Sequence, residues 1–354
     1  MRRTAIDLFS GCGGLTEGLT QAGFRVLCGA EIRPEARAAY LVNHPKVHVF
    51  EDVRKINLAA VNAHHSIKRG DLDLLAACPP CQGFSTLRTK KLGRVSDDER
   101  NNLIFEVLRI ATELLPKAIL VENVPGLLQN WRISNFRAGL KQLGYESNKA
   151  VLDASQFGVP QRRKRMIFIA IRSDNEPTIP EATSKTPVTV RDTISDIAFD
   201  AADDSVAALL HGIRQKLSNG VLDRVKRIPK DGGSRKSLGA DGQLPCHKKK
   251  DAGFNDVYGR LAWSKVAPTI TRSCHNPSKG RFLHPEEDRG LSLYEAMLLQ
   301  GFPKTYRLPT NIGIGKAASL IGEAFPPPFA KAQATHVENL LRAAFGERDG
   351  GLFP

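Results

Sequence analysis

The feature that most constrains the fold of this chain is an alternation, through its first half, of short apolar runs with amphipathic stretches. Short apolar runs are typical of buried strands, and amphipathic stretches between them are typical of helices that cover a parallel sheet. The sequence therefore predicts an α/β fold with a doubly wound sheet. The candidate strands are Thr4 to Phe9, Arg25 to Ala30, Val47 to Phe50, Leu72 to Ala77, Ala118 to Val121 and Arg165 to Arg172.

Caps and prolines mark where helices begin and end. Pro34 suits a first helical turn, Pro116 stops a helix, and Ser292 with Glu295 has the spacing of a capping box. The predicted helices are Leu15 to Ala22, a segment that opens with Pro34, Asn102 to Leu115, a segment that starts after Ser292, and Phe329 to Phe345.

The middle of the chain has a different texture. From about Asp174 to His284 it is rich in Pro, Ser, Thr and Gly and has weak periodicity. Between His211 and Arg281 it holds sixteen Lys and Arg against five Asp and Glu, a large part of the formal net charge of +14. Because Lys and Arg that face phosphates release counterions, this charge favours a nucleic acid partner. We therefore expect a separate recognition module here.

Hydrophobicity and cysteine content narrow the class of protein. No stretch approaches the roughly 20 apolar residues of a membrane-spanning helix, and the basic start lacks the apolar run of a signal peptide. Six cysteines in 354 residues are too few for a disulfide scaffold, which favours reduced thiols. We expect a cytoplasmic protein without membrane contact.

Glycines and acids follow the first three predicted strands. The first strand runs into Ser10-Gly11-Cys12-Gly13-Gly14, the second ends at Glu31 and the third at Glu51-Asp52. Ligands of open parallel sheets bind outside the carboxyl ends of the strands. This order suits an adenosine, with glycines near its tail, one acid at the ribose hydroxyls and a second at the adenine amino group. Taken singly, the glycines also suit a plain strand-to-helix turn, and the acids suit solvated loops.

Two cysteines, Cys78 and Cys81, follow the fourth predicted strand. Such a pair also suits half of a zinc site or a redox dithiol. Zinc would need a second pair, and the candidates are the distant Cys246-His247 and Cys274-His275, while the poorly periodic segment after Cys81 argues against the helix of a redox dithiol. The fifth strand ends at Glu122, and a carboxyl group beside a thiol suits a pair of nucleophile and acid.

These residues resemble the motifs of the DNA cytosine-5 methyltransferases of the bacterial modification type, and they occur in the family's order. The matching segments are Asp7 to Gly14 for the cofactor motif, Pro79 to Ser85 for the nucleophile motif, Glu122 to Val124 for the acid motif, Gln161 to Arg165 for the glutamine and arginine motif, and Arg289 to Pro303 for the segment that packs the recognition domain against the core.

The resemblance implies a doubly wound S-adenosylmethionine-dependent methyltransferase sheet with a smaller, irregular target recognition domain. It predicts a catalytic and cofactor-binding domain at residues 1–173, a target recognition domain at residues 174–284 and a C-terminal segment at residues 285–354 that returns to the catalytic domain. The implied reaction transfers a methyl group to carbon 5 of a flipped-out cytosine in a specific duplex DNA sequence through a covalent Cys81 adduct.

The resemblance also assigns roles to single residues. The implied catalytic residues are Cys81 as nucleophile, Glu122 at ring nitrogen 3, and Arg163 and Arg165 near the base. The implied cofactor-binding residues are Phe9 against the adenine, Gly11, Gly13, Gly14, Glu31 at the ribose, Asp52 at the adenine amino group, Val53, Pro79, Leu103 in the pocket wall, Glu323 and Ala324. The implied DNA-binding residues are Gln82, Ser85, Arg88, Gln161 and Arg272. The loop from Thr86 to Arg100 is expected to close over the DNA.

One motif departs from the family pattern. Near its end the chain has Gly322-Glu323-Ala324-Phe325-Pro326, whereas the family usually has Asn at the position of Glu323. Glu323 either points to solvent or faces the ammonium group of the cofactor's methionine part, and the sequence leaves both readings open.

Two alternatives are a tRNA cytosine methyltransferase of the same fold and a catalytically silent DNA-binding relative. The long basic stretch before His284 favours duplex DNA, and the presence of Cys81 and Glu122 argues against a silent relative. The expected partner is double-stranded DNA, bound by a monomer, with S-adenosylmethionine as cofactor, S-adenosylhomocysteine as product and no metal. A restriction endonuclease of the same specificity, where one exists, is expected to act without stable association.

Overall fold

The computed structural model describes residues 2–80, 98–198, 203–242, 244 and 256–346. By its internal contacts the chain divides into two compact units. Unit 1 comprises Met1–Phe157, Lys164–Thr183 and Phe325–Pro354, and unit 2 comprises Gly158–Arg163 and Ser184–Ala324. Unit 2 thus takes in residues 285–324, which fall in the predicted C-terminal segment. The functional division at residues 173 and 284 stays a prediction.

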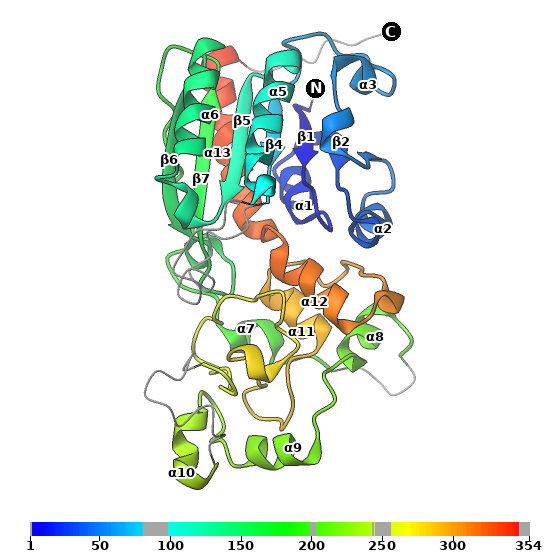
Figure 1. Cartoon of the computed structure of the whole chain (residues 1–354), viewed down its shortest axis with the longest axis vertical. Coiled ribbons are helices and arrows are strands. Elements are labelled where there is room, and N and C mark those ends of the chain that lie inside the picture. Colours follow the sequence, from blue (N-terminus) through cyan, green and yellow to red (C-terminus); the bar gives the residue numbers. More distant parts are fainter. Residues whose placement is uncertain (1, 81–97, 199–202, 243, 245–255, 347–354) are drawn as a thin grey trace. The chain divides into compact units, whose positions relative to one another are not determined.

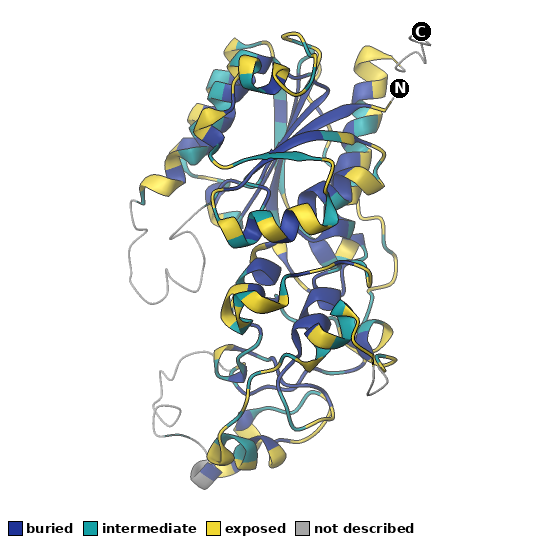
Figure 2. Cartoon of the chain, turned by 90° about the vertical axis from the view of Figure 1, so that its right-hand side faces the viewer, coloured by how far each residue is buried: buried dark blue, intermediate teal, exposed yellow. Residues whose placement is uncertain are grey.

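Unit 1 is built on a seven-stranded sheet in the order β3-β2-β1-β4-β5-β7-β6 (Figure 1). β1 to β5 pair in parallel, whereas β7 is antiparallel to both β5 and β6. β1, β4 and β5 are buried along their whole length, as expected for strands covered on both faces (Figure 2). The strands are β1 Thr4–Leu8, β2 Arg25–Ala30, β3 His48–Phe50, β4 Leu74–Ala77, β5 Ala118–Asn123, β6 Glu146–Asp153 and β7 Lys164–Ile171.

Helices lie on both faces of this sheet. α5 and α6 share an apolar core with the strands, for example through Ile110, Phe136 and Ile119. Figure 1 shows these two helices in front of the sheet and α13 behind it, where α13 packs against α1, β5 and β7. The helices of unit 1 are α1 Gly14–Gln21, α2 Pro34–Asn43, α3 Leu58–Asn62, α5 Ile104–Leu114, α6 Trp131–Gln142 and α13 Pro327–Phe345.

The predicted α/β sheet is confirmed, and Pro34 begins α2 as expected. The capping box also forms: Ser292 Oγ accepts from the Glu295 N–H at 3.1 Å, and the Glu295 carboxylate accepts from the Ser292 N–H at 2.8 Å. Strand β6 was not predicted from the sequence. Its residues are mostly half-buried and polar, so its pairing with β7 rather than its own pattern makes it a strand.

Unit 2 consists of short helices joined by long irregular segments. In its described part β-structure is limited to isolated bridges. Arg260 is 0% exposed and donates to the carbonyl oxygens of Val225, Ile228 and His284 at 3.0 to 3.1 Å. The buried guanidinium of Arg260 thus supplies hydrogen-bond donors to backbone carbonyl groups. In a sheet, such groups would accept from a neighbouring strand. The helices are α7 Val190–Ile194, α8 Val206–Gly212, α9 Asn219–Lys226, α10 Gly239–Gly242, α11 Leu293–Leu299 and α12 Ile314–Glu323.

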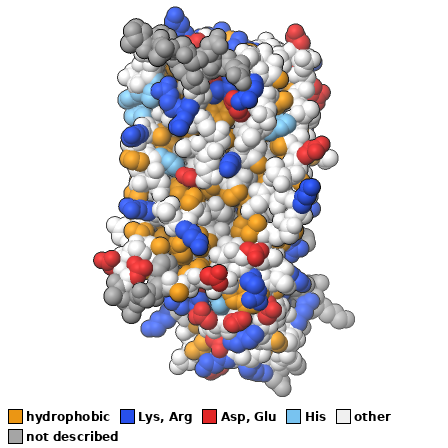
Figure 3. All heavy atoms as spheres, turned by 180° about the vertical axis from the view of Figure 1, so that it is seen from behind, with side chains coloured by type: hydrophobic (Ala, Val, Ile, Leu, Met, Phe, Trp, Pro, Cys, Tyr) orange, Lys and Arg blue, Asp and Glu red, His pale blue; other side chains and the backbone are white. Residues whose placement is uncertain are grey.

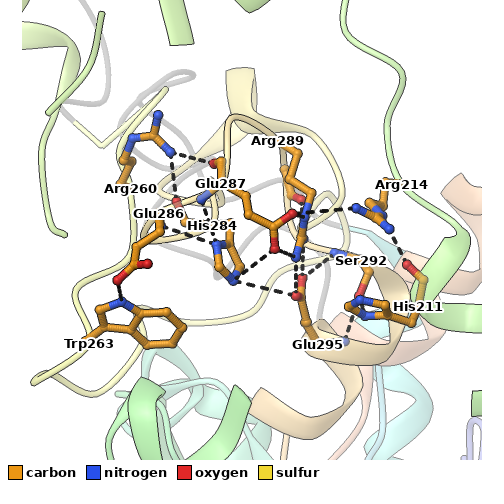
Figure 4. Close-up of polar contacts among 11 residues, drawn as sticks. His211, Arg214, Arg260, Trp263, His284, Glu286, Glu287, Arg289, Ser292 and Glu295 are labelled. Carbon is orange, nitrogen blue, oxygen red and sulfur yellow. Dashed lines mark hydrogen bonds and ion pairs between the residues drawn. The ribbon is translucent and has the colours of Figure 1, made fainter. Parts of the chain in front are cut away.

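A second polar cluster of unit 2 surrounds Glu295, which is 1% exposed (Figure 4). Arg289 donates to its two carboxylate oxygens at 2.7 and 2.8 Å. His284 accepts from the N–H of Glu287 at Nδ1, at 3.0 Å, and burial lowers the pKa of this imidazole. The start of the predicted packing segment, from Arg289 to Glu295, is therefore anchored inside unit 2.

A buried chain of hydrogen bonds ties β1 to α1 and α2. Thr16 Oγ1 donates to Asp7 Oδ2 at 2.7 Å and lies 2.8 Å from the Tyr40 hydroxyl, which therefore donates to it. Burial raises the pKa of Asp7 to about 7; the Thr16 hydrogen bonds oppose this rise and the Glu31 carboxylate adds to it. Asp7 therefore keeps its proton in the folded protein up to about neutral pH.

We expect Gly18→Ala to destabilise the contact between α1 and α13. A Cβ at Gly18 would lie 2.4 Å from Ala330 Cβ and 2.8 Å from the Pro327 carbonyl oxygen. Such overpacking costs about 1–3 kcal/mol, which outweighs the better helix propensity of alanine. Urea denaturation would measure the loss. Gly220→Ala in α9, where a Cβ meets nothing within 4 Å, is the matched control and should keep or raise stability. A Gly18→Ala protein as stable as the wild type would contradict this packing.

Asp7→Asn should change how stability depends on pH. Asp7 has a pKa of about 7 when folded, against an ordinary value of 3.8, so the unfolded state loses its proton first. The contribution of Asp7 to the free energy of unfolding therefore falls as pH rises from about 4 to about 7. The fall is at most about 4 kcal/mol, and the contribution is constant above that range. Asn carries no such dependence. Urea denaturation would measure the free energy of unfolding at pH 5 and at pH 8. Between these two pH values it should fall less for Asp7→Asn than for the wild type, and the exposed Asp204→Asn is the control. Equal losses in all three proteins would refute the buried, protonated Asp7.

Candidate active site

The turn after β1 brings backbone amides to the carboxyl edge of the sheet in unit 1. Gly11 and Gly13 have φ angles of 56° and 97°, in the left-handed region that glycine adopts without strain. Phe9 also has a positive φ of 60°, which is unusual for a residue with a side chain. The Gly13 N–H donates to the Ser10 carbonyl at 2.9 Å, and α1 begins at Gly14. The predicted glycine turn is therefore a strained connection that ends at a helix N-terminus.

Glu31 follows β2 and is bound to this turn. One carboxylate oxygen accepts from the Gly11 N–H at 2.9 Å, and the other accepts from the Arg33 N–H at 2.9 Å and its Nε at 3.1 Å. The residue is 8% exposed. A carboxylate has about four acceptor positions, so these donors orient Glu31 and leave room for ligand hydroxyls.

Asp52 follows β3 and caps the short helix Val53–Lys55. It accepts from the Arg54 N–H at 3.0 Å, and the Arg54 guanidinium, 2.7 Å away, lowers the pKa of this carboxyl. Val53 is part of the main apolar core, and Phe9 and Leu103 are partly buried against the same core. Three residues predicted to bind the cofactor thus belong to one apolar cluster in unit 1.

Ile32 is a candidate that the sequence reasoning missed. Its side chain is 65% exposed, although it is a large apolar residue directly after Glu31. The sequence signal that could have identified Ile32 is its position directly after Glu31, an acidic residue that follows β2. An exposed apolar side chain at this place suits contact with the flat face of a base.

Glu122 lies within β5 and forms an ion pair with Arg165 of β7, with 2.7 Å between Oε1 and Nε. The next residue, Asn123, donates from Nδ2 to the Pro79 carbonyl at 3.0 Å. This bond fixes the chain two residues before Cys81. Cys81, Gln82, Ser85 and Arg88, and most of the predicted closing loop, lie outside the described residues.

Arg163 and Gln161, predicted for catalysis and DNA binding, lie inside unit 2. Arg163 is 2% exposed and donates to the carbonyl oxygens of Ile270 and Gly322 at 3.2 and 3.1 Å. Gln161 is 0% exposed; its amide donates to the Leu299 carbonyl at 2.9 Å and accepts from the Ile270 N–H at 3.0 Å. Both side chains therefore hold segments of unit 2 together, and their predicted roles in the reaction stay predictions.

Glu323 ends α12 and forms an ion pair with Arg272 at 2.9 Å. Arg272 is 61% exposed in this pair and also donates to Ser319 Oγ at 3.3 Å. Ala324 is nearly buried, and its carbonyl accepts from the Gln300 side chain. The predicted cofactor residue Glu323 and the predicted DNA residue Arg272 are thus each other's partners.

Neither the surface charge nor the metal-ligating side chains of the described residues mark out a further site. On the face seen in Figure 3, Lys and Arg side chains are interspersed with Asp and Glu. In the described segments no group of three or more His, Cys, Asp and Glu is arranged to hold a metal ion. No helix among those segments is both long and apolar enough to cross a membrane.

Comparison with solved structures agrees with this architecture. A protein described as a DNA modification methyltransferase encoded within an E. coli prophage superposes with a TM-score of 0.73 at 24% identity, covering 96% of this chain and 99% of that one. The Dnmt2 methyltransferase of S. pombe gives a TM-score of 0.59 at 17% identity, with 97% and 99% covered. At these identities the likeness confirms the methyltransferase fold.

Sequence comparison identifies the family. The pattern of the C-5 cytosine-specific DNA methylases matches residues 3–339. Type II methylase M.HgiDII of Herpetosiphon aurantiacus is 32% identical over 344 residues, covering 95% of either chain. Type II methyltransferase M1.HphI of Haemophilus parahaemolyticus is 31% identical over 346 residues, covering 95% of this chain and 87% of that relative. This chain therefore belongs to the C-5 cytosine-specific DNA methylase family and is a DNA (cytosine-5)-methyltransferase.

Proposed function

We propose that the strand-end residues of unit 1 bind S-adenosylmethionine, the cofactor that the family implies. The cofactor supplies an electrophilic methyl group on a sulfonium. Phe9, Val53 and Leu103 offer an apolar surface for the adenine, since they share one core cluster, and Ile32 adds to it. Glu31, oriented by Gly11, accepts from the ribose hydroxyls. Asp52 accepts from the adenine amino group.

The methyl group passes to a target cytosine that has left the duplex, because the ring cannot be reached inside it. The Cys81 thiolate adds to carbon 6 and makes carbon 5 an enamine carbon. Glu122 hydrogen-bonds or protonates ring nitrogen 3 and offsets the charge that develops there. Carbon 5 would take the methyl group, with S-adenosylhomocysteine as the leaving group, and would then lose its proton to a base as elimination of Cys81 restores the ring.

The placement of Glu122 is the observation that carries this proposal. Its ion pair with Arg165 puts a carboxyl group and a cation at the end of β5, and Asn123 holds the Pro79 carbonyl of the segment that leads to Cys81. Cys78 is less suited to be the nucleophile. Burial raises the pKa of its thiol well above the usual value, and the Glu122 carboxylate adds to the rise. A protonated thiol is a poor nucleophile.

Sequence specificity is proposed to come from residues 174–284. Arg165 and the predicted DNA residues Gln82, Ser85, Arg88 and Arg272 hold the substrate, whereas the buried Arg163 and Gln161 act through the segments of unit 2 that they join. Figure 4 illustrates the kind of buried polar network that would keep this irregular segment in one shape. The type II relatives support a role in a restriction-modification system. The enzyme is proposed to act as a monomer on double-stranded DNA.

Duplex DNA with 5-fluorocytosine at the target should become covalently trapped on the enzyme in the presence of S-adenosylmethionine. Fluorine at carbon 5 cannot leave as a proton does, so elimination of Cys81 stops. Denaturing electrophoresis would detect the adduct. Cys81→Ala should abolish both methylation and trapping, whereas Cys274→Ala, at a buried cysteine of unit 2, should keep both. Methylation by Cys81→Ala would exclude the covalent mechanism, and methylation of tRNA in place of duplex DNA would exclude the proposed substrate.

If Glu323 faces the ammonium group of the cofactor, Glu323→Gln should weaken S-adenosylmethionine binding at least several-fold at low salt, because it removes the attracting charge. DNA affinity without cofactor should hold or rise, since the change also releases Arg272 from its pair. Such exposed pairs contribute only about 0–1 kcal/mol, so stability should hardly change. Calorimetry of both ligands would measure these effects, with the exposed Glu176→Gln as control. Equal cofactor affinity in Glu323→Gln and wild type would remove Glu323 from the cofactor site.

A further inference from the structure

Cys78 and Glu122 lie side by side at the ends of two neighbouring strands. β4 and β5 are parallel, and Ala77 pairs with Val121, so Cys78 and Glu122 are the next residues along the same register. Residues opposite each other in a sheet project from the same face. The Cys78 N–H donates to the Leu8 carbonyl of β1 at 3.1 Å, which fixes the backbone of this cysteine from the other side.

The side chains of these two residues interact. The register sets the Cys78 thiol beside the Glu122 carboxyl group, and this carboxyl group raises the pKa of the thiol. Three charged or titratable groups face the thiol: Glu122 from β5 and Asp7 from β1, which both raise its pKa, and Arg165 from β7, which lowers it. Burial is the largest cause of the raised pKa. The thiol therefore keeps its hydrogen at neutral pH and is available as a hydrogen-bond donor.

We propose that Cys78 is a positioning residue for Glu122, whose carboxyl group it holds from one side by a thiol hydrogen bond while Arg165 holds it from the other. This inference rests on the proposed function of Glu122 at the cytosine ring. A carboxyl group held by two donors from neighbouring strands has one orientation, which is what a group acting on a single ring nitrogen needs. Cys78 itself touches neither substrate nor cofactor in this role.

Positioning of this kind affects turnover more than binding. Glu122 matters most when charge develops on the ring, so loosening it should lower kcat and leave KM for S-adenosylmethionine and the affinity for DNA nearly unchanged. A cysteine that only filled space would behave differently. Its removal would lower stability, and a serine would be no better than an alanine.

The hydrogen bond itself can be measured without activity. Infrared difference spectra of wild type minus Cys78→Ala isolate the S–H stretching band of Cys78 from those of the other cysteines. We expect this band at lower frequency than that of a free thiol, because a carboxylate acceptor weakens the S–H bond. In a Glu122→Gln background the Cys78 band should move to higher frequency, since the neutral amide is a weaker acceptor. A band that does not respond to Glu122→Gln would overturn the inference, whatever the activity of the protein.

The kinetic test compares Cys78→Ala with Cys78→Ser. Losing a hydrogen bond to a charged group should lower kcat roughly tenfold in Cys78→Ala, with less than about a twofold change in KM or DNA affinity. Cys78→Ser keeps a donor and should recover most of the loss. Cys274→Ala, at a buried cysteine outside the site, controls for the general effect of removing a thiol.

The outcomes separate the inference from the function on which it rests. Equal kcat in Cys78→Ala and wild type, or equal losses in the alanine and serine variants, would overturn the positioning role and leave the methyltransferase mechanism standing. A wild-type protein that fails to trap 5-fluorocytosine DNA would overturn the proposed mechanism itself. The infrared measurement would still show whether Cys78 is bonded to Glu122.

Discussion

Parallel pairing of the central strands is the constraint on which the rest of the site depends. β1 pairs in parallel with β2 and β4, and β4 with β5, so the chain leaves all four strands at the same edge of the sheet. The glycine turn, Glu31 and Cys78 meet there because each directly follows a strand. Glu122 lies inside β5 itself, and a strand holds a side chain more firmly than a loop does. The positions of these site residues therefore depend on the buried backbone hydrogen bonds between the strands.

The same edge concentrates carboxyl groups, and burial limits how many of them carry charge. Asp7 is fully buried beneath the glycine turn, and its raised pKa of about 7 keeps it neutral through the acid range. The Arg165 guanidinium balances Glu122, and Arg33 balances Glu31. A site that keeps a few balanced carboxylates near an apolar cluster suits a ligand with an adenosine at one end and positive charge at the other.

Unit 2 differs from unit 1 in how its backbone is hydrogen-bonded, because the backbone groups of its irregular segments have no neighbouring strands to pair with. Arg260 accommodates several carbonyl groups with one buried guanidinium, and Arg289 does the same for the Glu295 carboxylate. Buried charges of this kind hold a defined shape only when every partner is present. Glu323, the acid that departs from the family motif, also has a cationic partner in unit 2. Its negative charge is balanced by the guanidinium of Arg272.

The sequence by itself determined the α/β class, six of the seven strands, the capping box and the motifs at the strand ends, because periodicity, caps and motifs are local properties. Only the tertiary structure decided that residues 146–153, most of them polar, form strand β6, since an edge strand depends on its partner β7. It also decided that Gln161 and Arg163 are buried within unit 2 and that Cys78 lies beside Glu122 in the register of β4 and β5. Such contacts join residues far apart in the chain, and neither their burial nor their partners leave a local pattern that sequence reasoning can read.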